Sequence, residues 1–375
     1  MFTWHRFVAI LWKEFVQMRR DRLTFAMMVG VPVMQLVLFG FAINMDPKGL
    51  PAAVVSADTS VFSRTFVRAL ENSGYFRVLA QPASVAESDR LIASGAVQFV
   101  LHIPEDFSRS LQRGERPVVL VEADATDPAA TSNALAALQS LNVSALDRDL
   151  TGVLAPLRAG PPPFEVRVHR RYNPEGVTQY NIVPGLMGVV LTMTMVMMTS
   201  IAMTRERERG TMENLLATPV TPLEVMIGKI VPYILVGYVQ VVVILVAARF
   251  LFNVPMVGSL VLLSAVLVFF MATNLSIGFT FSTLAKNQMQ AMQMTFFFFL
   301  PSMLLSGFMF PFRGMPDWAQ ALGEALPLTH FLRIVRGILL KGSNAVEVLP
   351  HLWPMAAILV VVAAIALRRY RRTLD

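Results

Sequence analysis

Long apolar runs alternate with polar segments along this chain, and the longest runs predict membrane-spanning helices. Residues 182–204 and 230–248 contain no Asp, Glu, Lys or Arg. A helix of about 20 such residues crosses roughly 30 Å of hydrocarbon. The same pattern predicts six spans in all, at residues 23–45, 182–204, 230–248, 256–279, 291–310 and 348–367. The expected fold class is therefore a polytopic α-helical membrane protein.

The pattern changes between the first and second spans, where residues 46–181 have the composition of a water-soluble domain. Short apolar runs predict strands at 52–55, 98–102, 118–121 and 164–168. Helical periodicity predicts helices at 62–71, 85–93 and 106–112, and one long helix at 131–157. This alternation indicates an inserted α/β domain. Because no glycine-rich phosphate loop follows a strand, a docking or substrate-gating role is favoured over a catalytic one.

The N-terminal segment and the segment before the last span are amphipathic. Residues 1–22 place Trp4, Phe7 and Leu11 on one side of a helical wheel and basic side chains on the other, which is typical of a helix lying in the membrane interface. An amphipathic helix packed on protein has the same pattern. Residues 311–347 predict short helices at the far membrane surface, and residues 368–375 form a basic tail.

The charged segment 205–229 lies between two of the predicted spans. It begins with a helix-forming stretch that Thr218-Pro219 interrupts. A new helix is expected to start with Thr221 as N-cap, Pro222 in the first helical position and Glu224 as the capping-box carboxylate. The segment therefore predicts a short helix, a sharp turn and a second helix that continues into the next span.

The motifs of this segment resemble those of ABC-2 type transporter permeases. The resemblance rests on E-R-E-R-G-T followed by L-L, T-P and G-K within residues 206–229, and it extends over nearly the whole chain. Matching pairs occur near the N-terminus, at Lys13-Glu14 and Arg20-Asp21. Further matches are Met315-Pro316, Pro327-Leu328-Thr329 and Arg336-Gly337.

The resemblance implies the membrane subunit of an ATP-binding-cassette exporter, of the multidrug or efflux type with a large extracytoplasmic domain. A short cytoplasmic helix would dock on a separate ATP-binding subunit, which would hold ATP and Mg²⁺, while this chain would bind no cofactor. The candidate coupling residues are Arg205, Glu206, Arg207, Glu208, Arg209, Gly210, Thr211, Met212, Glu213, Leu215, Leu216, Pro219, Thr221, Glu224, Gly228 and Lys229. The candidate interfacial residues are Lys13, Glu14, Arg20 and Asp21. A second permease, identical or related, would complete a dimer, and a periplasmic adaptor protein is a further candidate partner for residues 46–181.

Basic residues near the span ends predict the orientation. Fourteen lie on the side that holds both termini, residues 205–229 and Lys286, whereas five lie on the other side. Those five are Arg249, Arg313, Arg333, Arg336 and Lys341. Both termini are therefore expected in the cytoplasm of a bacterial cell, and residues 46–181 outside the cytoplasmic (inner) membrane.

Composition supports the membrane interpretation and excludes other classes. The chain is 55% hydrophobic and 15% charged, and its net charge of +7 does not indicate a nucleic-acid partner. Residues 44–181 hold thirteen basic and fifteen acidic side chains, so the basic surplus lies beside the spans, where the lipid bilayer accounts for it. Cysteine is absent, which leaves no disulfide or thiolate chemistry.

The sequence contains none of the enzyme motifs considered. The sequence contains no G-x-x-x-x-G-K-[ST], H-E-x-x-H or G-x-S-x-G motif, and its five histidines lack metal-ligand spacing, with His330 expected to be a packing residue. The spans hold almost no ionisable side chains, which argues against an ion-coupled carrier. Polar candidates along a pathway, or for hydrogen bonds between helices, are Thr192, Thr194, Gln240 and Asn274. The alternative function is a membrane-anchored receptor or scaffold whose outer domain binds a partner without transport.

Overall fold

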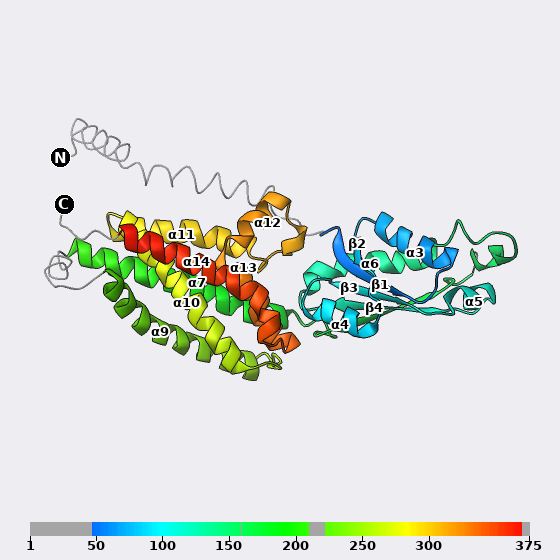
Figure 1. The fold of residues 1–375 in the computed structure, drawn as a ribbon, viewed down its shortest axis with the longest axis horizontal. Coiled ribbons are helices and arrows are strands. Elements are labelled where there is room, and N and C mark those ends of the chain that lie inside the picture. The colour runs from blue at the N-terminus through cyan, green and yellow to red at the C-terminus, as the bar shows by residue number, and fades with distance from the viewer. Residues whose placement is uncertain (1–46, 159, 210–221, 370–375) are drawn as a thin grey trace, which may run out of the picture.

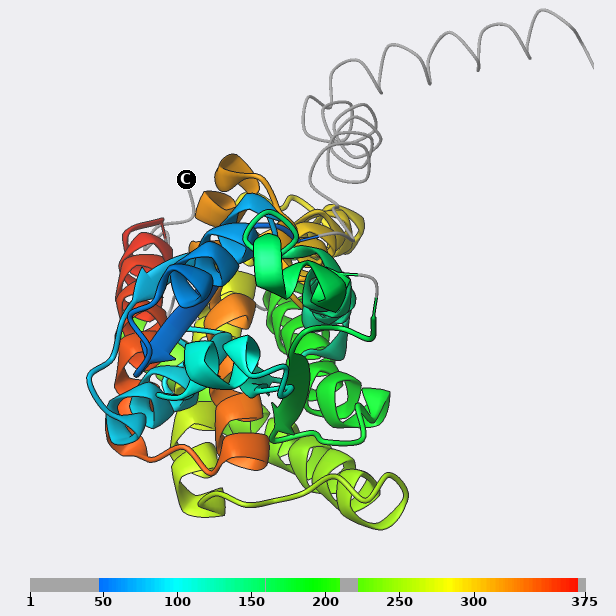
Figure 2. The ribbon, with the colours of Figure 1, turned by 90° about the vertical axis from the view of Figure 1, so that its right-hand side faces the viewer.

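The computed structural model describes residues 47–158, 160–209 and 222–369 in two parts, shown in Figure 1. A five-stranded sheet with its helices forms the sheet domain, which we define as residues 50–171. Long helices form the helix bundle beyond it. In Figure 2 the sheet domain lies in front of one end of the bundle. The predicted N-terminal helix and first span, residues 1–45, lie outside the described residues, and so do residues 210–221.

The sheet has the strand order β2-β1-β3-β4-β5. Neighbouring strands are parallel except β3 and β4, which pair antiparallel. This arrangement confirms an α/β region. The strands are β1 (Leu50–Ser56), β2 (Phe76–Ala80), β3 (Phe99–Ile103), β4 (Val118–Asp124) and β5 (Glu165–Arg171).

Helices cover both faces of the sheet. The main core packs Phe66 of α3 and Phe107 of α5 against Phe164, with ring centroids 5.0 and 5.7 Å away. On the opposite face, Ile92 of α4 packs with Val97 and residues of β1 and β3. The helices are α3 (Val61–Asn72), α4 (Val85–Ala93), α5 (Phe107–Gln112) and α6 (Pro128–Ser144).

The sheet domain differs from the sequence prediction in two places. The single helix predicted over 131–157 is wrong: α6 ends at Ser144, and a 3₁₀ helix, η2 (Gly152–Arg158), follows. Gly152 has φ +61° and Pro156 lies inside η2, and neither feature suits a continuous α-helix. Strand β2 was not predicted, because its five residues form a half-exposed edge strand without the continuous apolar run that marks the central strands.

The bundle contains α7 (Thr178–Glu208), α9 (Pro222–Phe250), α10 (Leu260–Leu284), α11 (Gln288–Leu305) and α14 (Ala345–Arg369). Within the described residues, four helices are long and apolar enough to cross a membrane, at Thr178–Glu206, Ile230–Phe250, Leu260–Leu284 and Ala345–Arg369. Helix α11 has 18 residues and is not among them. It ends before Gly307, whose φ of +83° stops the helix short of the predicted residue 310. The six-span topology stays a prediction.

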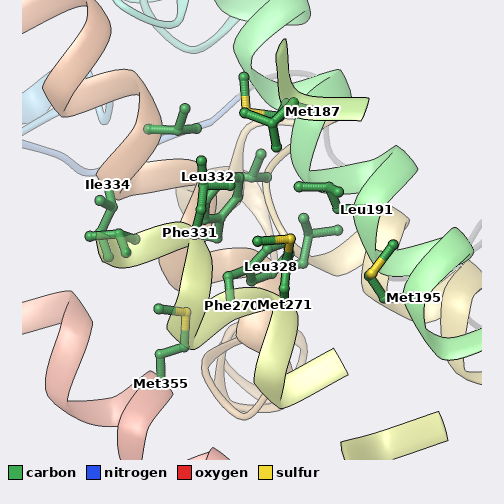
Figure 3. Close-up of a cluster of buried hydrophobic side chains, with 14 of the residues drawn as sticks. Met187, Leu191, Met195, Phe270, Met271, Leu328, Phe331, Leu332, Ile334 and Met355 are labelled. Atoms are coloured by element: carbon green, nitrogen blue, oxygen red, sulfur yellow. The ribbon is translucent and has the colours of Figure 1, made fainter. Parts of the chain in front are cut away.

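Two short helices follow α11, as the sequence predicts for residues 311–347. They are α12 (Asp317–Glu324) and α13 (Pro327–Arg336). Instead of forming a surface layer, α13 is buried in the bundle: Phe331 stacks on Phe270 of α10, with ring centroids 4.1 Å apart. Figure 3 shows this pair among Met187, Leu191 and Met195 of α7. Helix α13 is amphipathic, and its apolar side chains pack into the core of the bundle, among them Leu328, Phe331 and Val335.

Candidate functional site

The sheet domain and the helix bundle meet around a cavity of about 350 Å³, a junction that the sequence did not predict. The ends of β4 and α4 form its wall on the sheet-domain side. The ends of α11, α12, α13 and α14 form its wall on the bundle side. Its charged lining residues are Asp124, Asp127, Arg313, Glu324, Arg333, Arg336, Lys341 and Glu347.

Lys341 makes the most central contact across this junction. It ends the π-helical turn η4 (Gly337–Lys341), which follows α13 directly. Its Nζ lies 2.5 Å from Asp124 Oδ2 at the end of β4 and 3.4 Å from the carbonyl oxygen of Ile92. The same ammonium lies 5.2 Å from the ring centroid of Tyr172, a cation–π distance. Lys341 therefore contacts two segments of the sheet domain and the first residue of the link that follows it.

The other contacts across the junction are also polar. Arg313 donates from Nη2 to the carbonyl oxygen of Gly95 at 3.1 Å. Asn181, near the start of α7, donates from Nδ2 to Asp127 Oδ1 at 3.3 Å. Among the described residues, each cluster of buried apolar side chains stays within the sheet domain or within the bundle. Ion pairs and hydrogen bonds, rather than a shared apolar core, join the two parts.

Several buried polar atoms at the junction lack partners among the described residues. Arg336 donates from Nη1 to the carbonyl oxygen of Gly307 at 3.1 Å, but its Nε and Nη2 have no hydrogen-bond acceptor. Gln98 Oε1 and Asn181 Oδ1 are likewise buried without a donor. Burial raises the pKa of the Asp127 carboxyl, and the charge of Arg336 offsets only part of that rise. The junction thus holds charge that is incompletely paired.

The four polar residues predicted inside the spans lie within the bundle. Thr194 Oγ1 of α7 lies 3.0 Å from Gln240 Oε1 of α9, so the structure brings these two residues together. Thr192 and Asn274 are fully buried, and Thr192 Oγ1 and Asn274 Oδ1 have no partner among the described residues. Neutral groups of this kind can form hydrogen bonds along a pathway without carrying protons.

The described part of segment 205–229 lies at the opposite end of the bundle from the sheet domain. Glu208, the last residue of α7, accepts hydrogen bonds from the backbone N–H (2.8 Å) and side-chain amide of Gln288, the first residue of α11. Helix α9 is described from Pro222 onward and continues without interruption into the span at Ile230–Phe250. The predicted N-cap, Thr221, lies outside the described residues.

Most candidate coupling residues cannot be placed from the structure. Arg205 and Arg209 are exposed, and Glu206 is half-buried. The backbone of Glu224, Gly228 and Lys229 lies in α9. The remaining candidates lie outside the described residues or have side chains that are not described: Arg207, Gly210, Thr211, Met212, Glu213, Leu215, Leu216, Pro219 and Thr221. The interfacial candidates Lys13, Glu14, Arg20 and Asp21 lie outside the described residues as well.

Asp58 occupies the position in the sheet domain where a ligand would be expected. In open α/β sheets, ligands bind beyond the carboxyl ends of strands at the point where the strand order reverses, here between β1 and β3. Asp58 fills this position: its Oδ1 accepts the N–H of Ser60 at 2.6 Å, and its Oδ2 accepts the N–H of Ser108 at 2.7 Å. Burial raises and these hydrogen bonds lower the pKa of Asp58, with a net decrease. The carboxylate thus joins the starts of α3 and α5.

Among the described residues, no group of three or more His, Asp or Glu side chains is arranged to hold a metal ion. His330 is buried, 3% exposed, and its Nε2 lies 2.9 Å from the carbonyl oxygen of Glu324. This position agrees with the packing role expected from the sequence.

Comparison with known proteins identifies the family of this chain. A family model described as "ABC-2 family transporter protein" matches residues 22–368. The chain is 27% identical to the probable multidrug ABC transporter permease YbhS of Escherichia coli, over 100% of this chain and 98% of YbhS. It is also 27% identical to the probable multidrug ABC transporter permease YbhR of Escherichia coli, over 98% of this chain and 99% of YbhR. ABC transporter G family member 20 of Dictyostelium discoideum is 24% identical over 89% of this chain and 46% of its own length.

The bacterial relatives are named as transporter permeases and not as enzymes, in agreement with the interpretation of the sequence. The apolar helices and these relatives together indicate a multi-pass membrane protein. Because the family model covers nearly the whole chain, including the sheet domain and every described helix of the bundle, this protein belongs to the ABC-2 family of transporter proteins as a membrane permease.

Proposed function

We propose that this chain is the membrane subunit of an exporter that moves a hydrophobic or amphipathic substrate outward across the bacterial cytoplasmic membrane. ATP hydrolysis on a separate subunit drives the movement. Family membership supports transport, and the names of YbhS and YbhR support a multidrug-type substrate. The neutral, hydrogen-bonding interior of the bundle favours a substrate of low charge.

One observation carries the proposal: a single helix connects the two ends of the bundle. Helix α7 has 31 residues, a length of about 45 Å. It contacts the sheet domain through Asn181 at one end and α11 through Glu208 at the other. Segment 209–221 joins α7 to α9, so a displacement of this segment acts on both helices at once. A rigid helix transmits such a displacement to the junction.

The driving subunit is proposed to dock on segment 205–229 and to hold ATP and Mg²⁺. This chain has no phosphate-binding loop of its own. Leu215 and Leu216, with Met212, would form the apolar side of the contact, and Glu213 would contribute polar docking together with the basic residues at 205–209. Both chain termini would then lie in the cytoplasm, and the sheet domain outside.

A pathway between two bundles requires a second permease, so we propose a dimer of this chain or of this chain with a related one. Closed assemblies of two subunits have two-fold symmetry in most cases. The sheet domain is the proposed contact for a periplasmic adaptor, because it extends beyond the end of the bundle (Figure 1) and Asp58 occupies the position where it would be expected to bind a ligand.

The proposal is tested by the double variant Leu215→Asp/Leu216→Asp, expressed together with the ATP-binding subunit. Two carboxylates placed in an apolar contact without partners should disrupt docking. We expect loss of co-purification and of substrate-stimulated ATPase activity at equal membrane abundance. Val143→Asp/Val153→Asp, at two exposed positions of the sheet domain, is the matched control and should retain both. Unchanged co-purification and ATPase activity in the Leu215/Leu216 variant would show that the segment is only a connecting loop.

A further inference from the structure

The junction between the sheet domain and the bundle has the properties of an interface that separates. Interfaces within a chain that are small and polar permit relative motion, whereas large apolar ones do not. Here the described contacts are Lys341 with Asp124, Ile92 and Tyr172, Arg313 with Gly95, and Asn181 with Asp127. Each of these is polar or cation–π, and a cavity rather than packed side chains lies between the two walls.

The local backbone supports the same interpretation. Lys341 ends a π-helical turn, and Gly342 after it has φ +73°. Such turns are rare and occur frequently at functional sites. On the sheet-domain side, Tyr172 has φ +67°, a sparsely populated conformation for a bulky residue. Tyr172 begins the link from β5 to α7. Lys341 therefore lies between two irregular segments, one on each side of the junction.

The unpaired groups described above also suit a junction with a second arrangement. Buried polar atoms without partners are uncommon in a stable interface. Here Gln98 Oε1, Asn181 Oδ1 and two nitrogens of Arg336 share one small region. In contrast, Lys341 and Asp124 are buried and fully engaged, with side chains 11% and 8% exposed. This ion pair is also the shortest of the polar contacts that join the two parts.

We infer that the Lys341–Asp124 ion pair is a releasable catch that holds the sheet domain against the bundle and narrows access to the cavity, and that its release separates the sheet domain from the bundle. Lys341 is then a positioning residue: it acts through Asp124 and fixes the sheet-domain wall over the bundle. The inference that release accompanies transport depends on the function proposed above. The observed contact between Lys341 and Asp124 does not depend on it.

The absence of native cysteine permits a direct test with a single reporter. Ser306 lines the cavity on the bundle side, is 3% exposed and is remote in sequence from both members of the catch. Ser306→Cys, in the complex reconstituted into lipid nanodiscs, is labelled with a cationic methanethiosulfonate reagent. Because nanodiscs are open on both sides, the labelling rate does not depend on membrane orientation.

The catch predicts that Lys341→Met raises the labelling rate at position 306 by about tenfold or more, because a charge-assisted hydrogen bond is lost. Asp124→Asn should have the same effect from the sheet-domain side and serves as the second variant if Lys341→Met folds poorly. Lys341→Arg should stay close to the original rate, and the exchange Lys341→Asp/Asp124→Lys should reverse most of the increase. Labelling of Ser132→Cys, an exposed position on α6, should be equal in all backgrounds.

Equal labelling rates in the original protein, Lys341→Met and Asp124→Asn would overturn the catch. The role in transport has its own readout: ATP added with the ATP-binding subunit should raise the Ser306→Cys rate when Lys341 and Asp124 are intact. If Lys341→Met raises the rate but ATP has no effect, the catch is supported and the proposed ATP-driven function is contradicted.

Discussion

Gly278 of α10 lies so close to Val196 of α7 that a Cβ at position 278 would be 2.4 Å from the carbonyl oxygen of Val196. A Cβ cannot approach a backbone oxygen to this distance without displacement of one helix. The absence of a side chain at Gly278 therefore sets the separation of α7 and α10. This pair forms the centre of the bundle, so the position of α7 depends on it.

Gly278→Ala should destabilise the bundle by about 1–3 kcal/mol, the usual cost of overpacking. The rigid neighbour is backbone, so the strain cannot be relieved by a side-chain rotation. Thermal unfolding of the purified protein in detergent measures the effect as a lower Tm.

Gly237→Ala is the matched control for this helix contact. The Cβ would meet the sulfur atoms of Met271 and Met195, and methionine side chains adapt readily. We expect a smaller decrease in Tm than for Gly278→Ala. Equal decreases in the two variants would contradict the assignment of Gly278 as the spacing residue.

Asp58 should make the sheet domain sensitive to acid. Its folded-state pKa is lowered, so the folded state binds the proton less readily than the unfolded state. The stabilisation is present above the unfolded pKa of about 3.9 and is lost as the pH falls through the lower folded value. Protonation removes the charge that accepts the N–H groups of Ser60 and Ser108.

Hydrogen exchange of peptides covering the starts of α3 and α5 measures this effect, after correction for the intrinsic pH dependence of exchange. Asp58→Ala should lower protection at neutral pH in both peptides together, because one carboxylate serves both helices. In that variant the acid-dependent loss should disappear. If only one of the two helices loses protection, Asp58 does not link them.

Parts of the fold follow directly from local sequence. The apolar runs at β1, β3 and β4 and the charge-free stretches of α7 and α9 predict these elements, since burial in a sheet or a membrane requires continuous apolar residues. The break after Ser144 and the edge strand β2 were missed, because turn geometry and edge pairing leave a weak local signal.

The junction could not be predicted from local patterns. Lys341 and Asp124 are 217 residues apart in sequence, and no periodicity relates them. The charge count does place Lys341, Arg313, Arg333 and Arg336 on the same side as residues 46–181. The structure brings these four residues to the cavity beside the sheet domain. The sequence thus predicted on which side of the membrane these four residues lie, but not which residues they contact.

The predicted topology has a simple test in a chain without cysteine. Ser132→Cys lies on an exposed face of the sheet domain, and Thr373→Cys lies in the C-terminal tail. An impermeant thiol reagent should label the first and not the second in intact cells. After permeabilisation both should react. Labelling of Thr373→Cys alone in intact cells would reverse the proposed orientation and with it the side on which an ATP-binding subunit can dock.

Transport into inside-out membrane vesicles measures ATP-driven export by this permease. Vesicles that contain this permease and its ATP-binding subunit should accumulate an amphipathic fluorescent dye when ATP is added. Vesicles with an ATP-binding subunit whose Walker lysine is replaced by alanine should not. Accumulation that requires both the permease and ATP hydrolysis is the predicted result. Equal dye uptake with the active and the inactive subunit, across a panel of amphipathic dyes, would contradict the account.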